Sequence, residues 1–107
     1  CAAGWCRMRL LALERAVPGV EDAAFTPELK RAEALRAWEL YQAGQLRELY
    51  FRQDRPEAVL ILECQDTAEA RALLGSLPLV AHGLIDFEVI ALTAYPGFAR
   101  LFAPSDE

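Results

Sequence analysis

The stretch "LRELYFRQDRPEAVLILECQ", residues 46–65, has the pattern of two strands joined by a tight turn. In its first part, residues 46–53, Leu49 and Phe51 alternate with polar or amphipathic neighbours, which is typical of a strand that buries one face. The residues "DRPE" are a turn signal. The run that follows, residues 58–65, is more continuously apolar, as expected of a central strand. The segment therefore predicts a β-hairpin.

A strand and a helix are predicted before this hairpin. Residues 9–17 are short and apolar and end at a Pro-Gly turn signal, so we expect a strand there. Thr26 is a good N-cap residue, and Pro27 suits the first helical position. Apolar residues then recur at helical spacing until Gly44, which supplies a C-terminal stop.

A second helix and a last strand are predicted after the hairpin. Asp66 or Thr67 caps a short helix, "AEARALLGSL", and "LPLVAHGL" is interpreted as a connector. Residues 85–92 alternate again and predict a strand. The order is therefore β-α-β-β-α-β, which predicts an α+β, ferredoxin-like fold. In this fold two helices cover one face of a four-stranded antiparallel sheet, and the other face stays open.

Alternation along the strands assigns side chains to the two faces of the sheet. We expect the helix-covered face to hold Leu11, Leu13, Leu49, Phe51, Leu60, Leu62, Ile85, Phe87 and Val89. The open face is then expected to hold Glu14, Glu48, Tyr50, Arg52, Glu63, Asp86 and Glu88, mixed with Leu10, Ala12, Val59, Ile61 and Ile90. Such a half-apolar, half-charged face favours a dimeric α/β barrel, in which a second copy closes over it.

Composition agrees with one small domain that self-associates. The chain has 107 residues, and its hydrophobic fraction of 54% exceeds the usual value of about 45–50%. That surplus is hard to bury in so short a monomer, so we expect a homodimer or larger homo-oligomer. A net charge of −5 disfavours nucleic acid as a partner. Phosphate-binding loops and nucleotide fingerprints are missing, which argues against kinases and dehydrogenases.

Cysteine and histidine usage argues against a metal site and against disulfides. The three cysteines are Cys1, Cys6 and Cys64, and His82 is the single histidine. A structural zinc site needs four nearby ligands, so we expect no metal and no cofactor. Cys64 lies in an apolar run and is predicted to be a small buried hydrophobe. These features favour a reduced, cytoplasmic protein. No apolar run approaches the ~18 residues of a membrane span, so we expect no membrane partner.

The two ends of the sequence are assigned outside the main domain. Residues 1–7, which precede the sole methionine, are interpreted as a leader or tag remnant. The domain itself is placed at residues 8–94. Residues 95–107 form a tail rich in aromatic residues, which we expect to dock on the partner subunit or over a sheet edge.

The segments "AGQLRELYF", "AVLILECQDTAEARALLGSLPL" and "DFEVIAL" resemble the muconolactone isomerase family over roughly residues 8–98. Gly44, "LLGSLPL" at 73–79 and "FEV" at 87–89 carry the resemblance most clearly. It implies a βαββαβ fold, dimeric barrels that assemble into larger oligomers, and a cofactor-free double-bond shift in an unsaturated lactone. In that reaction a base takes a proton beside a carbonyl and an acid returns it elsewhere.

Some polar positions depart from the family pattern. Glu33 matches an acidic position of the family's first helix, but Ala34 stands where the family has a lysine. Glu48 stands where the family has a histidine, and Tyr50 where it has a tryptophan. After the last strand the family's basic, His-containing segment is replaced by "TAYPGF".

Glu33, Tyr50 and Arg52 are the first candidates for catalysis. Glu33 could accept a proton if it turns inward, or it could be a solvated helix acid that pairs with Lys30 or Arg36. Tyr50 and Arg52 are expected on the open face, where a hydroxyl and a guanidinium could stabilise an enolate or hold a carboxylate. The alternative is that both line the barrel and pair with acids there.

The remaining candidates are two strand acids, a loop histidine and two helix aromatics. Glu88 and Glu63 could act as a general base if burial raises their pKa, or could pair with Arg52. His82 could do acid–base work near the pocket mouth, or could simply be exposed. The catalytic candidates are thus Glu33, Tyr50, Arg52, His82 and Glu88. Trp38 and Tyr41 could form an aromatic pocket wall or belong to the core. The substrate-binding candidates are Trp38, Tyr41, Glu48 and Glu63.

Three functions remain open from the sequence. The first is a cofactor-independent isomerase or cyclase that acts by proton transfer on a small, lactone-like cyclic carbonyl compound. The second is a cofactor-free monooxygenase of the dimeric α/β-barrel type. The third is a non-catalytic dimer that binds a small molecule or serves a structural role.

Overall fold

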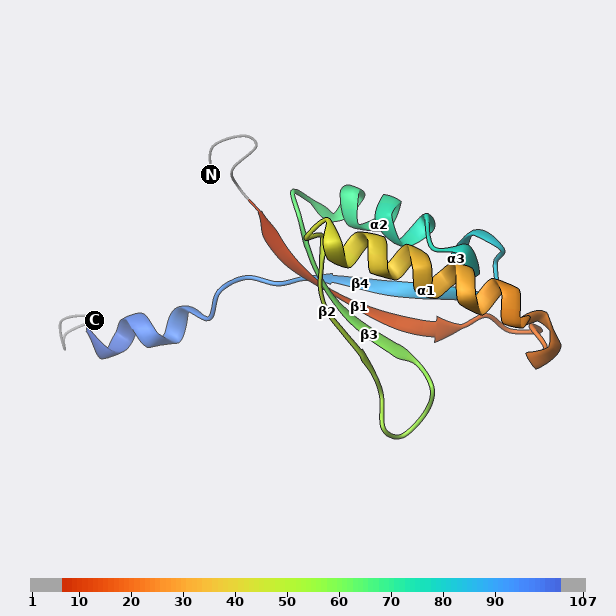
Figure 1. The fold of residues 1–107 in the computed structure, drawn as a ribbon. Coiled ribbons are helices and arrows are strands. Elements are labelled where there is room, and N and C mark those ends of the chain that lie inside the picture. The colour runs from red at the N-terminus through yellow and green to blue at the C-terminus, as the bar shows by residue number, and fades with distance from the viewer. Residues whose placement is uncertain (1–6, 103–107) are drawn as a thin grey trace.

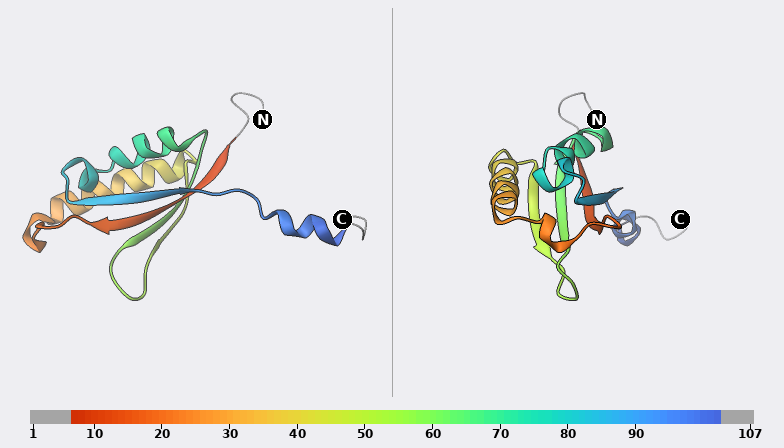
Figure 2. Two further views of the ribbon diagram at one scale, coloured as in Figure 1. Left: turned by 180° about the vertical axis from the view of Figure 1, so that it is seen from behind. Right: turned by 90° about the vertical axis from the view of Figure 1, so that its right-hand side faces the viewer.

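The computed structural model describes residues 7–102, which form one sheet covered on one side by helices (Figure 1, Figure 2). The four strands are antiparallel neighbours in the order β2-β3-β1-β4, so the predicted α+β, βαββαβ arrangement is confirmed. The elements are β1 (Met8–Ala16), η1 (Asp22–Ala24), α1 (Pro27–Gln42), β2 (Leu46–Phe51), β3 (Ala58–Cys64), α2 (Thr67–Gly75), α3 (Pro78–Ala81), β4 (Ile85–Ala91) and η2 (Pro96–Leu101). Among the described residues, no helix is both long and apolar enough to cross a membrane.

Capping residues mark both ends of α1 and the start of α2. The Thr26 hydroxyl accepts the backbone N–H of Leu29 at 3.2 Å, and Pro27 follows at the first helical position of α1. Gly44, just after α1, has a φ of +86°, which side-chain-bearing residues rarely adopt. At α2 the cap is Asp66, whose carboxylate accepts the N–H of Glu69 at 2.8 Å. Local sequence chemistry therefore sets these helix boundaries.

The hydrophobic core lies between the sheet and the helices. The largest fully buried side chains in it are Leu10, Leu46, Leu62 and Cys64. The predicted burial of Cys64 is thus confirmed, and burial raises the pKa of its thiol to about 11. The rest of the core consists of Ala12, Leu40, Ala58, Leu60, Ala70, Leu74, Leu77, Ile85 and Phe87.

The side chains of β1 were assigned to the wrong faces of the sheet, because the predicted alternation was out of phase by one residue. Leu10 and Ala12 pair with Leu62 and Leu60 of β3 and lie in the core, whereas Leu11 is opposite Ile61 on the open side. Every residue from 10 to 13 is apolar, so alternation alone gives this strand no phase. By the same shift Leu13 moves to the open side, and Glu14 moves from the open to the helix-facing side.

The hairpin prediction is confirmed, with one irregularity in β2. Its pairing shifts between Leu46 and Glu48, so Arg47 is an extra residue in that strand. The bulge explains why Leu46 and Leu49 both lie on the helix side although they are an odd number of residues apart. Beyond β2, Arg52 donates its backbone N–H to the carbonyl of Glu57 at 2.9 Å.

Two segments expected to be irregular are helical. The connector after α2 contains α3, which starts with Pro78 in its first turn. The described part of the predicted tail forms η2 and projects away from the sheet (Figure 1). Residues 1–6 and 103–107, parts of the predicted leader and tail, lie outside the described residues.

Candidate functional site

Glu33 is turned toward the interior rather than toward solvent. Its Oε1 accepts the backbone N–H of Leu79 at 2.9 Å, in a partly buried contact between α1 and α3. The first N–H groups of a helix have no partner within it, so the start of α3 offers this donor. Burial raises the pKa of the Glu33 carboxyl; the Leu79 hydrogen bond opposes the rise and the nearby charge of Glu14 adds to it. The Glu33 carboxyl is therefore held between α1 and α3 by one hydrogen bond, with a pKa above its ordinary value.

Glu14 is a second half-buried carboxylate on the helix-facing side, and sequence reasoning missed it. Its Oε1 accepts the backbone N–H of Ala58 at 2.9 Å, which ties the end of β1 to the start of β3. Burial raises its pKa, the Ala58 bond lowers it, and the charge of Glu57 raises it further. The correct phase of β1 would have placed Glu14 beneath the helices with Glu33.

A cavity of about 350 Å³ opens beside Glu14 at the end of β1. Its charged groups balance one another: Arg55 Nε bonds Glu57 at 2.8 Å, and a guanidinium nitrogen of Arg52 lies 3.9 Å from the same carboxylate. Arg52 also forms two hydrogen bonds with Asp54, at 2.8 and 2.6 Å. The cavity is lined by Leu13, Glu14, Arg15, Ala16, Arg52, Arg55 and Glu57.

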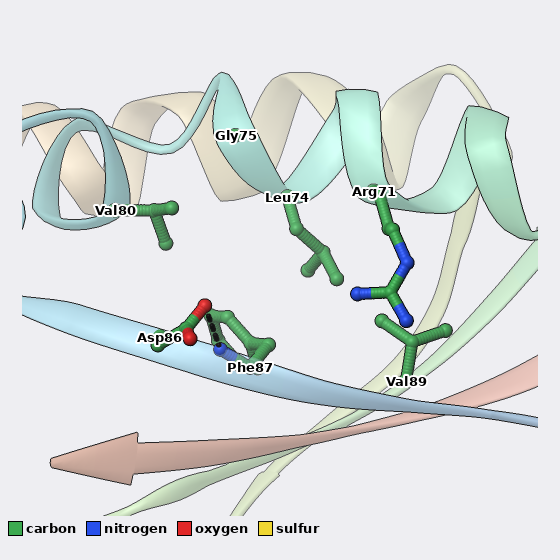
Figure 3. A pocket seen from close by; sticks show the side chains of 7 residues that line it. All are labelled: Arg71, Leu74, Gly75, Val80, Asp86, Phe87 and Val89. Atoms are coloured by element: carbon green, nitrogen blue, oxygen red, sulfur yellow. Dashed lines mark hydrogen bonds between the residues drawn. The ribbon is translucent and has the colours of Figure 1, made fainter.

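A smaller cavity of about 110 Å³ lies between α2, α3 and β4 (Figure 3). Its floor is apolar, and Arg71 extends from α2 toward Val89 (Figure 3). At the other end, the carboxylate of Asp86 accepts the backbone N–H of Phe87 at 2.8 Å. The residues that line it, none of them a predicted site residue, are Arg71, Leu74, Gly75, Val80, Asp86, Phe87 and Val89.

Tyr50 and Arg52 do not contact each other as an oxyanion-binding pair. The Tyr50 hydroxyl donates to Glu48 at 2.7 Å on the open side of β2, while Arg52 bonds to Asp54. The hydrogen bond to Glu48 and the charge of that carboxylate raise the pKa of the Tyr50 phenol. Arg52 lines the larger cavity, and Tyr50 does not.

Glu88 and Glu63 are ion-paired on the open side, but not with Arg52. Glu88 is paired with Arg15 of the neighbouring strand. Glu63 lies 3.8 Å from both Arg9 and Arg47. The expected pairing of Glu88 and Glu63 with Arg52 is therefore wrong, because both acids pair with other arginines.

His82, Trp38 and Tyr41 lie away from both cavities. His82 is exposed at the end of α3, with Nδ1 2.8 Å from the carbonyl oxygen of Pro78. Trp38 and Tyr41 are each 53% exposed and stack on each other with ring centroids 5.7 Å apart. They are therefore neither core residues nor a wall of the described cavities. Of the predicted site residues, Glu33 and Arg52 are the two that lie near Glu14.

Comparison with known proteins identifies the family of this α+β chain. The muconolactone delta-isomerase family profile matches residues 10–97. The chain therefore belongs to the muconolactone delta-isomerase family.

A solved structure gives independent support for the fold. A crystal structure of muconolactone isomerase superposes with a TM-score of 0.69, covering 83% of this chain and 92% of that one at 23% sequence identity. At this identity the similarity supports the fold alone. No curated protein has a significant sequence match to the chain.

Proposed function

We propose that this protein is a cofactor-independent isomerase that moves a proton on a small, lactone-like cyclic carbonyl compound. Family membership supports an isomerase-type reaction. The single observation that supports this chemistry best is the placement of the Glu33 carboxylate. It points inward and accepts a hydrogen bond from the backbone of Leu79, and burial raises its pKa. A general base works best when its pKa lies near the operating pH, and burial moves a carboxyl in that direction.

In the proposed reaction Glu33 takes a proton from the carbon beside the carbonyl and returns it to the far end of the conjugated system. Glu14 keeps a second negative charge nearby, which favours the protonated form of Glu33 after the first step. Arg52, at the edge of the larger cavity, is available to stabilise the developing enolate oxygen once a ligand displaces Asp54.

The proposal includes a second copy that closes over the open sheet face. Leu11, Leu13, Val59 and Ile61 are only partly buried there, and Ile90 is 37% exposed. An apolar sheet face of this kind, flanked by charged residues, is typical of an interaction surface. We further propose that the assembly works in the cytoplasm, since the buried Cys64 is a free thiol.

Proton exchange in D₂O tests this function with a panel of five- and six-membered unsaturated lactones. NMR should show deuterium entering the carbon beside the carbonyl, together with movement of the double bond. Glu33→Gln should reduce the rate at least about 100-fold, the lower range for general-base catalysis. Glu39→Gln is the matched control on the same helix, because that acid is exposed and paired with Arg36.

One outcome would remove Glu33 from the proposed mechanism, and two others would overturn the isomerase activity itself. Equal rates for Glu33→Gln and wild type would remove Glu33 from the chemistry. Oxygen consumption with phenols or quinols, without lactone exchange, would favour the monooxygenase alternative. Saturable ligand binding without any exchange would favour a binding protein.

A further inference from the structure

Two side chains of α1, one helical turn apart, both form hydrogen bonds with the turn between α2 and α3. Glu33 accepts the backbone N–H of Leu79 at 2.9 Å. Arg36 donates from Nε to the hydroxyl oxygen of Ser76, also at 2.9 Å. The two partners are three residues apart on the turn, as the two donors of side chains are on α1, and α1 runs in the opposite direction to α2 (Figure 1). The two hydrogen bonds therefore lie side by side, and we name them the clamp.

The C-terminal end of α2 favours the positive charge that Arg36 brings. Ser76 is the C-cap residue of α2, and its hydroxyl donates to the carbonyl oxygen of Leu73 at 2.6 Å. The last carbonyl groups of a helix have no partner within it and carry the negative end of the helix dipole. The last turn of α2 contains no basic residue of its own. Arg36 therefore supplies, from α1, a cation at this helix end.

Arg36 reaches Ser76 without losing its partner on α1. Its Nη1 donates to Glu39 at 3.1 Å, which leaves Nε for the Ser76 hydroxyl. The Arg36 side chain is 35% exposed, so water competes for both contacts. The bond to Ser76 is therefore expected to set the local geometry of the turn and to add little to global stability.

A short, rigid link joins Ser76 to the backbone N–H that holds Glu33. The link consists of Leu77, which is buried in the core, and Pro78, whose ring fixes its φ. Leu79 comes next. Because neither linking residue has much conformational freedom, a displacement of Ser76 also displaces the N–H of Leu79.

We propose that Arg36 and Ser76 are positioning residues for Glu33, because their hydrogen bond fixes the turn from which the Leu79 N–H holds the Glu33 carboxylate. This inference rests on the function proposed above for Glu33 and adds two residues that act through it. Neither Arg36 nor Ser76 lines either of the two cavities, so a direct contact with substrate is not part of their role.

Proton NMR of the Leu79 amide tests the positioning role without any substrate. In the wild-type full chain this resonance should shift as the Glu33 carboxyl titrates, and the shift should vanish in Glu33→Gln. Ser76→Ala and Arg36→Ala should each reduce the shift and speed hydrogen exchange at Leu79 about two- to tenfold, as expected for loss of one hydrogen bond. Ser76→Thr keeps the hydroxyl, and Arg31→Ala removes an exposed arginine of the same helix, so both should behave as wild type.

Two further measurements separate a local role from a general loss of stability. Hydrogen exchange at Glu69, whose N–H is held by Asp66 at the other end of α2, should not change in the two alanine variants. Ser76→Ala should also lower the rate of lactone proton exchange at saturating substrate at least about threefold, because a displaced base reacts more slowly. Ser76→Thr should restore that rate.

An unchanged Leu79 shift and exchange rate in both alanine variants would overturn the clamp. Faster exchange at both Leu79 and Glu69 would show general destabilisation and overturn the positioning role, as would a normal lactone rate in Ser76→Ala. A wild-type chain that catalyses no lactone exchange would overturn the proposed function instead, and the Leu79 measurements, which need no substrate, would still decide the clamp.

Discussion

The carboxylate of Glu33 on α1 accepts the backbone N–H of Leu79 on α3 at 2.9 Å, in a partly buried contact between the two helices. The two residues are 46 positions apart in the chain, and the "SLPL" turn brings them together. Leu77 is buried beneath this turn, so the donor is held in place by the core. The same contact satisfies an N–H at the start of α3 and positions the proposed base.

Glu14 and Glu33 both have a raised pKa, which predicts that the stability of the folded chain depends on pH. Both carboxyls have a pKa raised above 4.5 by burial in the folded state. Between the unfolded and folded pKa values the folded chain binds more protons than the unfolded chain, so their contribution to stability falls as pH rises. Glu14→Gln and Glu33→Gln should therefore flatten the decline in unfolding free energy as pH rises above about 4.5.

The size of this effect is limited by solvent, because both carboxyls are only half-buried. At pH 7 each glutamine variant should be equal to or more stable than wild type, by less than about 1 kcal/mol after screening. Urea unfolding at several pH values measures the difference from wild type, with Glu39→Gln as control. Glutamine variants that steepen the decline would contradict the assigned direction of the pKa shifts.

Leu10 and Leu11 face opposite sides of the sheet, so alanine substitutions at the two positions should have different effects on stability. Leu10 is fully buried, so Leu10→Ala should cost about 2–5 kcal/mol of unfolding free energy. Leu11 lies on the open side, so Leu11→Ala should cost less than about 1.5 kcal/mol and should mainly weaken self-association. Urea unfolding at two protein concentrations separates the effects. Equal losses of unfolding free energy in the two variants would contradict the register of β1.

Gly44 and Gly75 provide a matched test of backbone conformation. Gly44 has a φ of +86°, so Gly44→Ala should cost about 1–2 kcal/mol. Gly75 is helical with open space where a Cβ would lie, so Gly75→Ala should be neutral or stabilising by up to about 1 kcal/mol. Thermal unfolding of both variants measures this. A stabilising Gly44→Ala would contradict the left-handed turn after α1.

The buried thiol of Cys64 should be unreactive in the folded protein. Its pKa is raised to about 11, so almost no thiolate is present at pH 8, and the side chain is inaccessible. In a Cys1→Ser, Cys6→Ser background, Ellman's reagent should label Cys64 only after urea is added. Labelling of one thiol within seconds in native buffer would show that the core is open at this position.

The sequence predicted the fold better than it predicted the site. Local signals such as Thr26, Pro27 and Gly44 act on their own neighbours, so the boundaries of α1 could be inferred from them. The phase of β1 depends instead on pairing with β3, and four consecutive apolar residues conceal it. Because Glu14 follows that phase, the second carboxylate was assigned to the wrong face.

Side-chain partners were also beyond the reach of local patterns. Tyr50 and Arg52 share alternation in the sequence, but each has a nearer partner two residues away, Glu48 and Asp54. The exposure of Trp38 and Tyr41 could not be foreseen either, since α1 has contacts with β2 and α3 and leaves these rings outside them. Tertiary packing decides such contacts, and helical spacing alone does not.

Sedimentation equilibrium of the full chain at low micromolar concentration tests the central claim, that a second copy completes the sheet's open face. The account predicts a single folded species of at least twice the 11.9 kDa chain mass. It also predicts dissociation in Leu13→Glu, a substitution on the open face that leaves the helix-covered core intact. A well-folded wild-type particle of 11.9 kDa at that concentration would contradict it.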